Sequence, residues 1–141
     1  MKIAVGSDHG GYELKTVLIR KLERQGHLVV DAGCNSTVSV DYPDFAGRVC
    51  SLVIDGEVER GILICGTGIG MSVAANRFVE IRAALCHDEY TARMSRAHND
   101  ANVLCLGARV LGVGVADAVV DVWLDTGFEG DRHLQRIAKI S

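Results

Sequence analysis

Cys65 begins the segment Cys-Gly-Thr-Gly-Ile-Gly, in which three alternating glycines follow the thiol directly. Glycines at the start of a helix allow backbone N–H groups to face an anion, and the helix dipole favours negative charge there. A cysteine at a helix N-terminus ionises more readily and can act as a base or a nucleophile. Two simpler interpretations stay open: Gly66, Gly68 and Gly70 serve only a tight turn, or Cys65 is a buried structural residue.

The glycine segment differs from two nucleotide-binding motifs. The third glycine of a dinucleotide fingerprint would fall on Met71, and no lysine follows Gly66 or Gly70 as a P-loop requires. Thr67 has two possible roles, since its hydroxyl could donate to an oxyanion that develops in a reaction or could cap the helix. The segment therefore favours an anion site over a nucleotide site.

Polar residues also stand next to other predicted elements. Asp8 and His9 follow the first predicted strand, where they either line a site or form an Asx-type turn. The cluster His98-Asn99-Asp100 precedes the fifth strand and either turns the chain or points into a site. Arg132 and Arg136 lie four residues apart on one helix face, which suits a phosphate but also an ordinary solvated face. Each of these signals is modest by itself.

The histidines and cysteines do not form a metal-ligand pattern. The chain has no HExxH motif and no Cys/His spacing suited to zinc, so neither a metal nor a cofactor is expected. The five cysteines are odd in number, widely spaced and without a CxxC pair, as free thiols are in a reducing compartment. The N-terminus turns polar too early for a signal peptide, so the sequence predicts a cytoplasmic protein.

Strands and helices must alternate to position these residues. Apolar, β-branched runs predict five strands, over 2–6, 28–33, 61–65, 81–86 and 103–106. Helical spacing predicts helices over 12–25, 44–55, 69–76, 89–96, 113–124 and 132–140, with Leu14, Val17, Leu18 and Leu22 facing inward in the first. This pattern predicts an α/β fold, a single doubly wound Rossmann-like domain over residues 1–141 with a five-stranded parallel sheet and helices on both faces. Ligands of such sheets bind beyond the carboxyl ends of the strands.

Composition narrows the possible partners. The chain has 141 residues, a net charge of −3 and no block of lysine and arginine, which argues against nucleic acid or an anionic membrane as the main partner. No apolar run reaches the roughly 18–20 residues that span a bilayer. A small molecule is the partner that this composition leaves.

In order along the chain, several segments resemble the type B ribose-5-phosphate isomerase family, which also includes allose- and galactose-6-phosphate isomerases. The matching stretches cover nearly the whole chain without a large insertion: 6–11 (GSDHGG), 41–44 (DYPD), 61–70 (GILICGTGIG), 74–76 (AAN), 95–104 (SRAHNDANVL) and 107–110 (GARV). Such a series is far more specific than the glycine turn alone.

The resemblance implies an aldose–ketose isomerase that interconverts ribose 5-phosphate and ribulose 5-phosphate through an enediolate, without a metal. It makes Cys65 the base, His98 the residue that assists ring opening, and Thr67 part of the pocket for the enediolate oxygen. The other residues that it assigns bind the substrate: the backbone of Gly66, Gly68, Ile69 and Gly70, the site-lining Asp8 and His9, the sugar contact Asn99, and the phosphate-binding Arg109, Arg132 and Arg136.

The resemblance further implies a homodimer, or a tetramer of dimers, with the site between two subunits. One branch of the family has a glutamate base where this chain has Met71, so Cys65 places the chain in the cysteine branch. Two alternatives remain, a six-carbon substrate (allose 6-phosphate or galactose 6-phosphate) and a sugar-phosphate-binding protein without catalysis.

Overall fold

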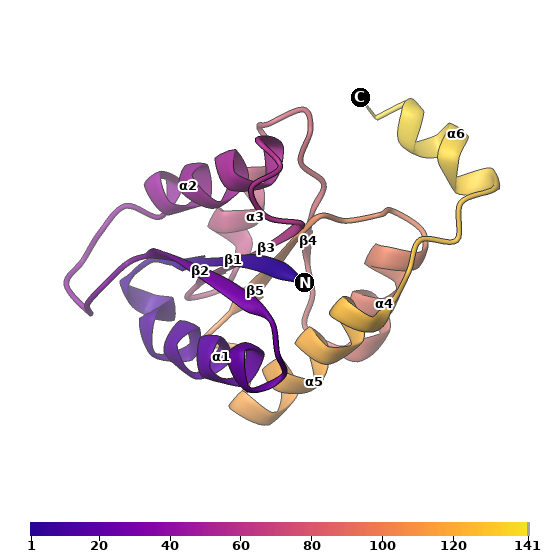
Figure 1. The fold of residues 1–141 in the computed structure, drawn as a ribbon. Helices are drawn as coiled ribbons and strands as arrows, with labels where there is room; N and C mark the ends of the chain where they lie inside the picture. Colours follow the sequence, from indigo (N-terminus) through magenta and orange to yellow (C-terminus); the bar gives the residue numbers. More distant parts are fainter. Residues whose placement is uncertain (141) are drawn as a thin grey trace.

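Five parallel strands form one sheet in the computed structural model, which describes residues 1–140 (Figure 1). The strand order is β2-β1-β3-β5-β4, so the chain starts near the middle of the sheet and builds outward in two directions. The strands are β1 (Lys2–Ser7), β2 (Leu28–Gly33), β3 (Arg60–Cys65), β4 (Ala83–Leu85) and β5 (Val103–Gly107). Because all pairs are parallel, the carboxyl ends of the strands share one edge of the sheet.

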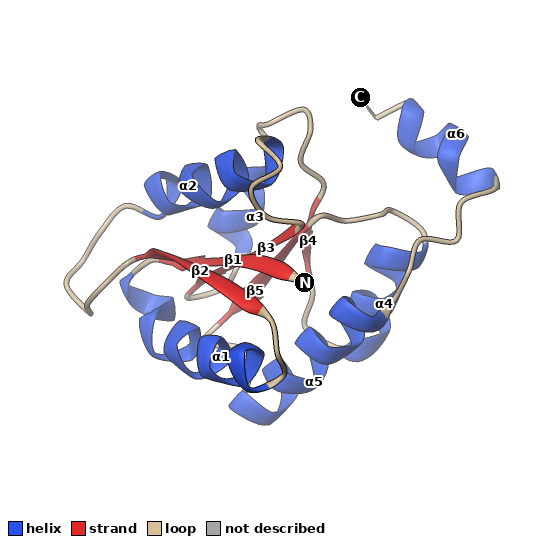
Figure 2. Cartoon of the chain, in the orientation of Figure 1, coloured by secondary structure: helices blue, strands red, loops and turns tan. Residues whose placement is uncertain are grey.

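Helices cover both faces of this sheet, as Figure 2 shows. In chain order they are the 3-10 turn η1 (His9–Gly11), then α1 (Tyr12–Arg24), α2 (Tyr42–Ile54), α3 (Ile69–Ala75), α4 (Glu89–Ala97), α5 (Val113–Asp125) and α6 (Arg132–Ala138). Helices α1, α4 and α5 pack on one face, and α2 and α3 pack on the other. Helix α6 projects from the body of the molecule beyond α5 (Figure 1). The predicted doubly wound α/β fold is confirmed.

Side chains of the central strands alternate between two apolar cores. Ile62 and Ile64 pack with α1 and α5, whereas Leu63 and Cys65 point to the opposite face and pack with α2 and α3. All four are buried, and burial of a large aliphatic side chain contributes roughly 1.5–3 kcal/mol. Packing against α2 and α3 therefore fixes the side chain of Cys65, and β3 ends at this residue, at the carboxyl edge of the sheet.

Three details of the predicted elements are wrong. Val17 is 38% exposed rather than inward, because α1 buries the stems of two lysines instead, Lys15 and Lys21, with their ammonium groups paired to distant aspartates. The fourth strand is only Ala83–Leu85, since the amide of Arg82 bonds to the side chain of Asn102 rather than to a strand. Helix α2 begins at Tyr42 and contains Pro43 in its first turn, where the missing N–H costs nothing.

Candidate active site

The glycine segment forms a tight turn between β3 and α3. Gly68 has φ +77°, a left-handed conformation that favours glycine. A methyl group at Gly68 would lie 2.5 Å from Cδ1 of Leu85 and 2.9 Å from the backbone of Leu106, so the space also requires glycine. The turn is thus packed against the ends of β4 and β5.

The turn places a hydrogen-bond donor on the thiol of Cys65. The amide of Gly68 donates to Sγ of Cys65 over 3.1 Å, and the side chain of Cys65 is 5% exposed. A donor at this distance stabilises negative charge on the sulfur. Thr67 is exposed, and its Oγ1 accepts from the amide of Ile69 over 3.2 Å, so in this state the hydroxyl caps α3.

The loop after β1 lies beside this turn. One oxygen of Asp8 accepts from the amides of Gly10 and Gly11, at 2.9 and 3.3 Å, and Asp8 is buried. His9 accepts from the amide of Val40 through Nδ1 at 3.2 Å, which ties the loop between β2 and α2 to this edge. Asp8 therefore does form the Asx-type turn, and it does so next to the thiol-bearing loop.

Arg109 bridges the two loops. A methyl group at Gly66 would lie 3.2 Å from Nη1 of Arg109, and one at Gly10 would lie 3.6 Å from Nη2. The amide of Arg109 also donates to the carbonyl of Gly66 over 2.9 Å, which fixes the base of the side chain. A hollow of about 380 Å³ opens beside Arg109, so its exposed guanidinium can meet an anion from solvent.

Tyr42 is a residue of this edge that the sequence interpretation missed. A side chain at Gly70 would lie 2.8 Å from the Tyr42 ring, so the first turn of α2 packs directly against the glycine segment. Tyr42 could have been predicted as a site residue if the helix had been started at Tyr42, because a helix that begins there brings this ring to the carboxyl edge.

Four predicted site residues lie far from Cys65 in the structure. Helix α4 runs back from the carboxyl edge, so His98 and Asn99 at its end reach the amino edge, where the carbonyl of Asn102 accepts from the amide of Gly61. Arg132 and Arg136 are exposed on α6, which contacts this same end of the molecule through His133. One chain thus brings Cys65, Thr67, Asp8, His9 and Arg109 together but separates them from His98, Asn99, Arg132 and Arg136.

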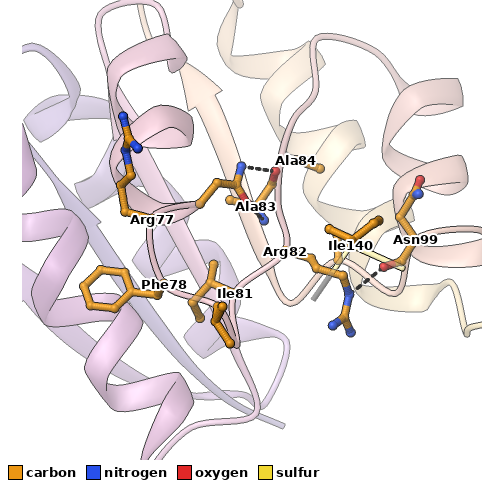
Figure 3. A pocket seen from close by; sticks show the side chains of 11 residues that line it. Arg77, Phe78, Ile81, Arg82, Ala83, Ala84, Asn99 and Ile140 are labelled. Carbon is orange, nitrogen blue, oxygen red and sulfur yellow. Dashed lines mark hydrogen bonds between the residues drawn. The ribbon is translucent and has the colours of Figure 1, made fainter. Parts of the chain in front are cut away.

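A pocket of about 410 Å³ lies at the amino edge (Figure 3). Arg77, Phe78 and Ile140 contribute to its wall, together with Arg82, whose Nε donates to the carbonyl of Asn99 over 2.8 Å. The bond uses the main chain of Asn99 and leaves its exposed amide available. No predicted catalytic residue lines this pocket.

The thiols of the core differ from Cys65 in their surroundings. Burial raises the pKa of Cys50 to about 11 and also raises the pKa values of Cys86 and Cys105. All five cysteines are free thiols. Cys65 is the one that stands in the glycine turn with a main-chain donor on its sulfur.

The fold and this site define a class, a doubly wound α/β protein whose loops beyond the carboxyl ends of the strands are suited to a small anionic ligand. The chain belongs to the ribose/galactose isomerase family, because a model of that family matches residues 3–140. Among residues 1–140, no helix is both long enough and apolar enough to cross a membrane.

Similar proteins that are named for an activity agree with this family. Ribose-5-phosphate isomerase B of Escherichia coli is 49% identical over 140 residues, which cover 99% of this chain and 94% of that protein. The structure of ribose-5-phosphate isomerase B of Clostridium thermocellum superposes with a TM-score of 0.99 at 54% identity, over 99% of this chain and 95% of that one. For the enzyme of Thermotoga maritima the TM-score is 0.97 at 49% identity, over 99% and 96% of the two chains.

Proposed function

We propose that this chain is an isomerase that interconverts ribose 5-phosphate and ribulose 5-phosphate, with Cys65 as its base. Family membership and relatives named for this activity support the reaction. The observation that carries the role of Cys65 is the Gly68 amide on its sulfur at 3.1 Å. A thiolate held beside main-chain donors is suited to remove a proton from carbon next to a carbonyl.

The reaction moves two protons, one between C2 and C1 through Cys65 and one between the two oxygens of the enediolate. In the open-chain aldose, the thiolate of Cys65 takes the proton from C2, and the electron pair of the broken C–H bond forms the C1–C2 double bond of an enediolate. The charge that develops on the C1 oxygen is stabilised by N–H groups of the glycine segment and by Thr67, whose hydroxyl is exposed and can rotate to donate. The proton of the C2 hydroxyl passes to the C1 oxygen, the C2 oxygen becomes the carbonyl, and the thiol returns its proton to C1, which gives the ketose and restores the thiolate.

Phosphate binding is the proposed task of the arginines. Arg109 already lies over the loops after β1 and β3. Interactions with the phosphate are remote from the reacting carbons, so they hold the substrate and lower the barrier through orientation. Asp8, His9 and the backbone of Gly66–Gly70 would contact the part of the sugar between the phosphate and the reacting carbons.

The remaining residues require a second copy of the chain. His98, Asn99, Arg132 and Arg136 belong to the amino edge and to α6, so within one chain they do not meet Cys65. We propose a homodimer, or a tetramer of dimers, in which these residues of one copy complete the carboxyl-edge site of the other. Exposed apolar side chains on α3 and α6, Ile69, Val73 and Leu134, support such an interface. The five free thiols support the proposed cytoplasmic location.

The test is turnover of ribose 5-phosphate by purified protein in EDTA, with Cys65→Ala and the matched control Cys50→Ala, which removes a buried thiol away from the turn. We expect Cys65→Ala to lose at least about a thousandfold in kcat while it still binds ribose 5-phosphate, and Cys50→Ala to retain turnover. Full activity of Cys65→Ala would refute the role of Cys65. Binding without turnover by the wild type would indicate a non-catalytic protein, and turnover of only allose or galactose 6-phosphate would indicate a six-carbon substrate.

A further inference from the structure

Three side chains from two distant segments of the chain meet where α4 ends and α6 begins. They are His98, Glu129 and His133, and each offers a nitrogen or oxygen within 4.8 Å of the other two. Oε2 of Glu129 lies 3.6 Å from Nε2 of His133 and 3.9 Å from Nε2 of His98. The two imidazole rings stack, with centroids 4.3 Å apart and an interplanar angle of 16°. Both Nε2 atoms therefore face the same carboxylate.

His133 has an unexplained polar atom at this point. The residue is 4% exposed, and its Nε2 is buried without a hydrogen-bond partner among residues 1–140. Buried polar atoms nearly always have a partner, so an orphan atom that faces two other ligating groups indicates a missing one. The 3.6 Å separation from Glu129 is too long for a hydrogen bond but leaves room for a shared atom.

The chemistry of the three groups identifies that atom. Two imidazole nitrogens and one carboxylate oxygen form a typical Zn²⁺ ligand set with a fourth position open. Since Zn–N and Zn–O bonds are near 2.0–2.2 Å, two ligands of one ion lie no more than about 4.2–4.4 Å apart. The separations from Glu129 to both histidines meet this limit. In the stacked arrangement the ring planes are nearly parallel, so His98, which is 38% exposed and ends a helix, rotates out of the stack to bring its Nε2 to the ion.

The surrounding charge favours reversible over permanent binding. Arg132 and Arg136 lie near His133 on α6, and their guanidinium groups repel a cation, whereas the carboxylate of Glu129 attracts it. A buried structural zinc site would instead be surrounded by groups that offset the charge of the ion. Glu129 is also 54% exposed, which provides a path from solvent.

We propose that His98, Glu129 and His133 bind one zinc-like divalent transition-metal ion reversibly, and that the bound ion inhibits the isomerase. Inhibition follows because coordination occupies Nε2 of His98, which is then unable to exchange a proton with the ring oxygen of the sugar. The inhibitory effect rests on the proposed function of His98, but the binding site does not. The ion is an inhibitor in this proposal, so the isomerase reaction itself proceeds without it.

Binding is tested without reference to activity. Metal-free full-length protein is titrated with Co²⁺, followed by its visible absorption, and with Zn²⁺, followed by calorimetry. We expect one ion per chain for the wild type and at least tenfold weaker binding for Glu129→Gln and His133→Gln. The control His87→Gln removes an exposed histidine elsewhere and should bind like the wild type. Glu129 is exposed, so Glu129→Gln remains informative if His133→Gln does not fold.

The absence of saturable binding, or equal affinities for the wild type and Glu129→Gln, would overturn the site. The inhibitory effect is tested by turnover at increasing Zn²⁺: half-inhibition should match the measured dissociation constant, EDTA should restore the rate, and Glu129→Gln should require at least tenfold more zinc. Stoichiometric binding without inhibition would overturn the inhibitory effect alone. A wild type that binds zinc but never isomerises a sugar phosphate would refute the proposed function and leave the site standing.

Discussion

The amide nitrogen of Gly68 donates to the sulfur of Cys65 over 3.1 Å, across a turn of four residues. The bond exists because Gly68 adopts φ +77°, which turns its N–H back toward the end of β3. Leu85 and Leu106 hold this conformation from the neighbouring strands. The proposed base is therefore positioned by the backbone of its own turn, and the turn by the sheet.

Gly68→Ala should lose both stability and activity. An added methyl group would meet Cδ1 of Leu85 at 2.5 Å and the backbone of Leu106 at 2.9 Å, in a conformation that alanine rarely adopts. Strain and crowding together should lower the free energy of unfolding by roughly 2–4 kcal/mol, measured by denaturant titration. Turnover should fall by more than the loss of folded protein explains, because the Gly68 amide that donates to Cys65 moves.

Gly47→Ala is the matched control for that change. Gly47 lies inside α2, where an added methyl group has nothing within 4 Å. Alanine there should raise the free energy of unfolding by about 0.4–1 kcal/mol, since it reduces the freedom of the unfolded chain. If Gly68→Ala were as stable and as active as Gly47→Ala, the turn would have no role in positioning Cys65.

Alkylation should distinguish Cys65 from the thiols of the core. Burial raises the pKa of Cys50 to about 11, so at pH 8 only about one Cys50 side chain in a thousand is a thiolate. The pKa values of Cys86 and Cys105 are raised in the same direction. Iodoacetamide at pH 8 should therefore label Cys65 before Cys50, Cys86 and Cys105, in parallel with the loss of turnover, as peptide mass spectrometry would show.

Labelling at higher pH tests whether the raised pKa of Cys50 is what protects it at pH 8. Below pH 11 the thiolate fraction of Cys50 grows about tenfold with each pH unit, so labelling of Cys50 in the folded protein should increase in the same proportion. Cys65→Ala provides the control, because it should lose the rapid phase at pH 8 and keep the slow one. Equal rates for Cys50 and Cys65 at pH 8 would show that the turn does not activate its thiol.

Arg109→Lys should weaken substrate binding more than it slows chemistry. Lysine keeps the positive charge but loses the planar pair of donors that suits a phosphate. A lost charge-assisted hydrogen bond of about 1.5–3 kcal/mol corresponds to a KM for ribose 5-phosphate that is raised roughly tenfold to a hundredfold. Arg20→Lys, an exposed arginine on α1, is the control and should leave KM unchanged. A fall in kcat at constant KM would instead place Arg109 at the reacting end.

Much of the carboxyl-edge site was predictable from the sequence. Apolar runs fix where β1 and β3 end, and in a parallel sheet those ends must share an edge, so Asp8 and Cys65 could be placed near each other. The spacing of glycines also predicted a tight turn at Gly68. Both inferences need only the local sequence pattern and the rule that parallel strands end at a common edge of the sheet.

The rest depended on contacts between distant segments. The stacking of His98 on His133 joins residues 35 positions apart, and no local periodicity encodes it. The inward Val17 was wrong for a similar reason, because α1 buries Lys15 against Asp31 of β2, a partner that the helical pattern does not reveal. Such pairs become visible only when the elements are packed together.

Mixing two inactive variants should restore activity if the site lies between copies of the chain. In Cys65→Ala every site lacks the base, and in His98→Asn every site lacks the ring-opening group. A mixed dimer has one site with both changes and one site with neither, because each proposed site takes Cys65 from one chain and His98 from the other.

Random exchange of subunits gives mixed dimers for half of the molecules, and half of their sites are intact. Turnover after unfolding and refolding the two variants together should therefore approach about one quarter of the wild-type value, measured per chain, if the two changes act independently. Each variant refolded alone is the control and should stay inactive. A site formed within one chain always retains one of the two substitutions and so stays inactive. If the mixture is as inactive as each variant alone, Cys65 and His98 do not act across a subunit interface.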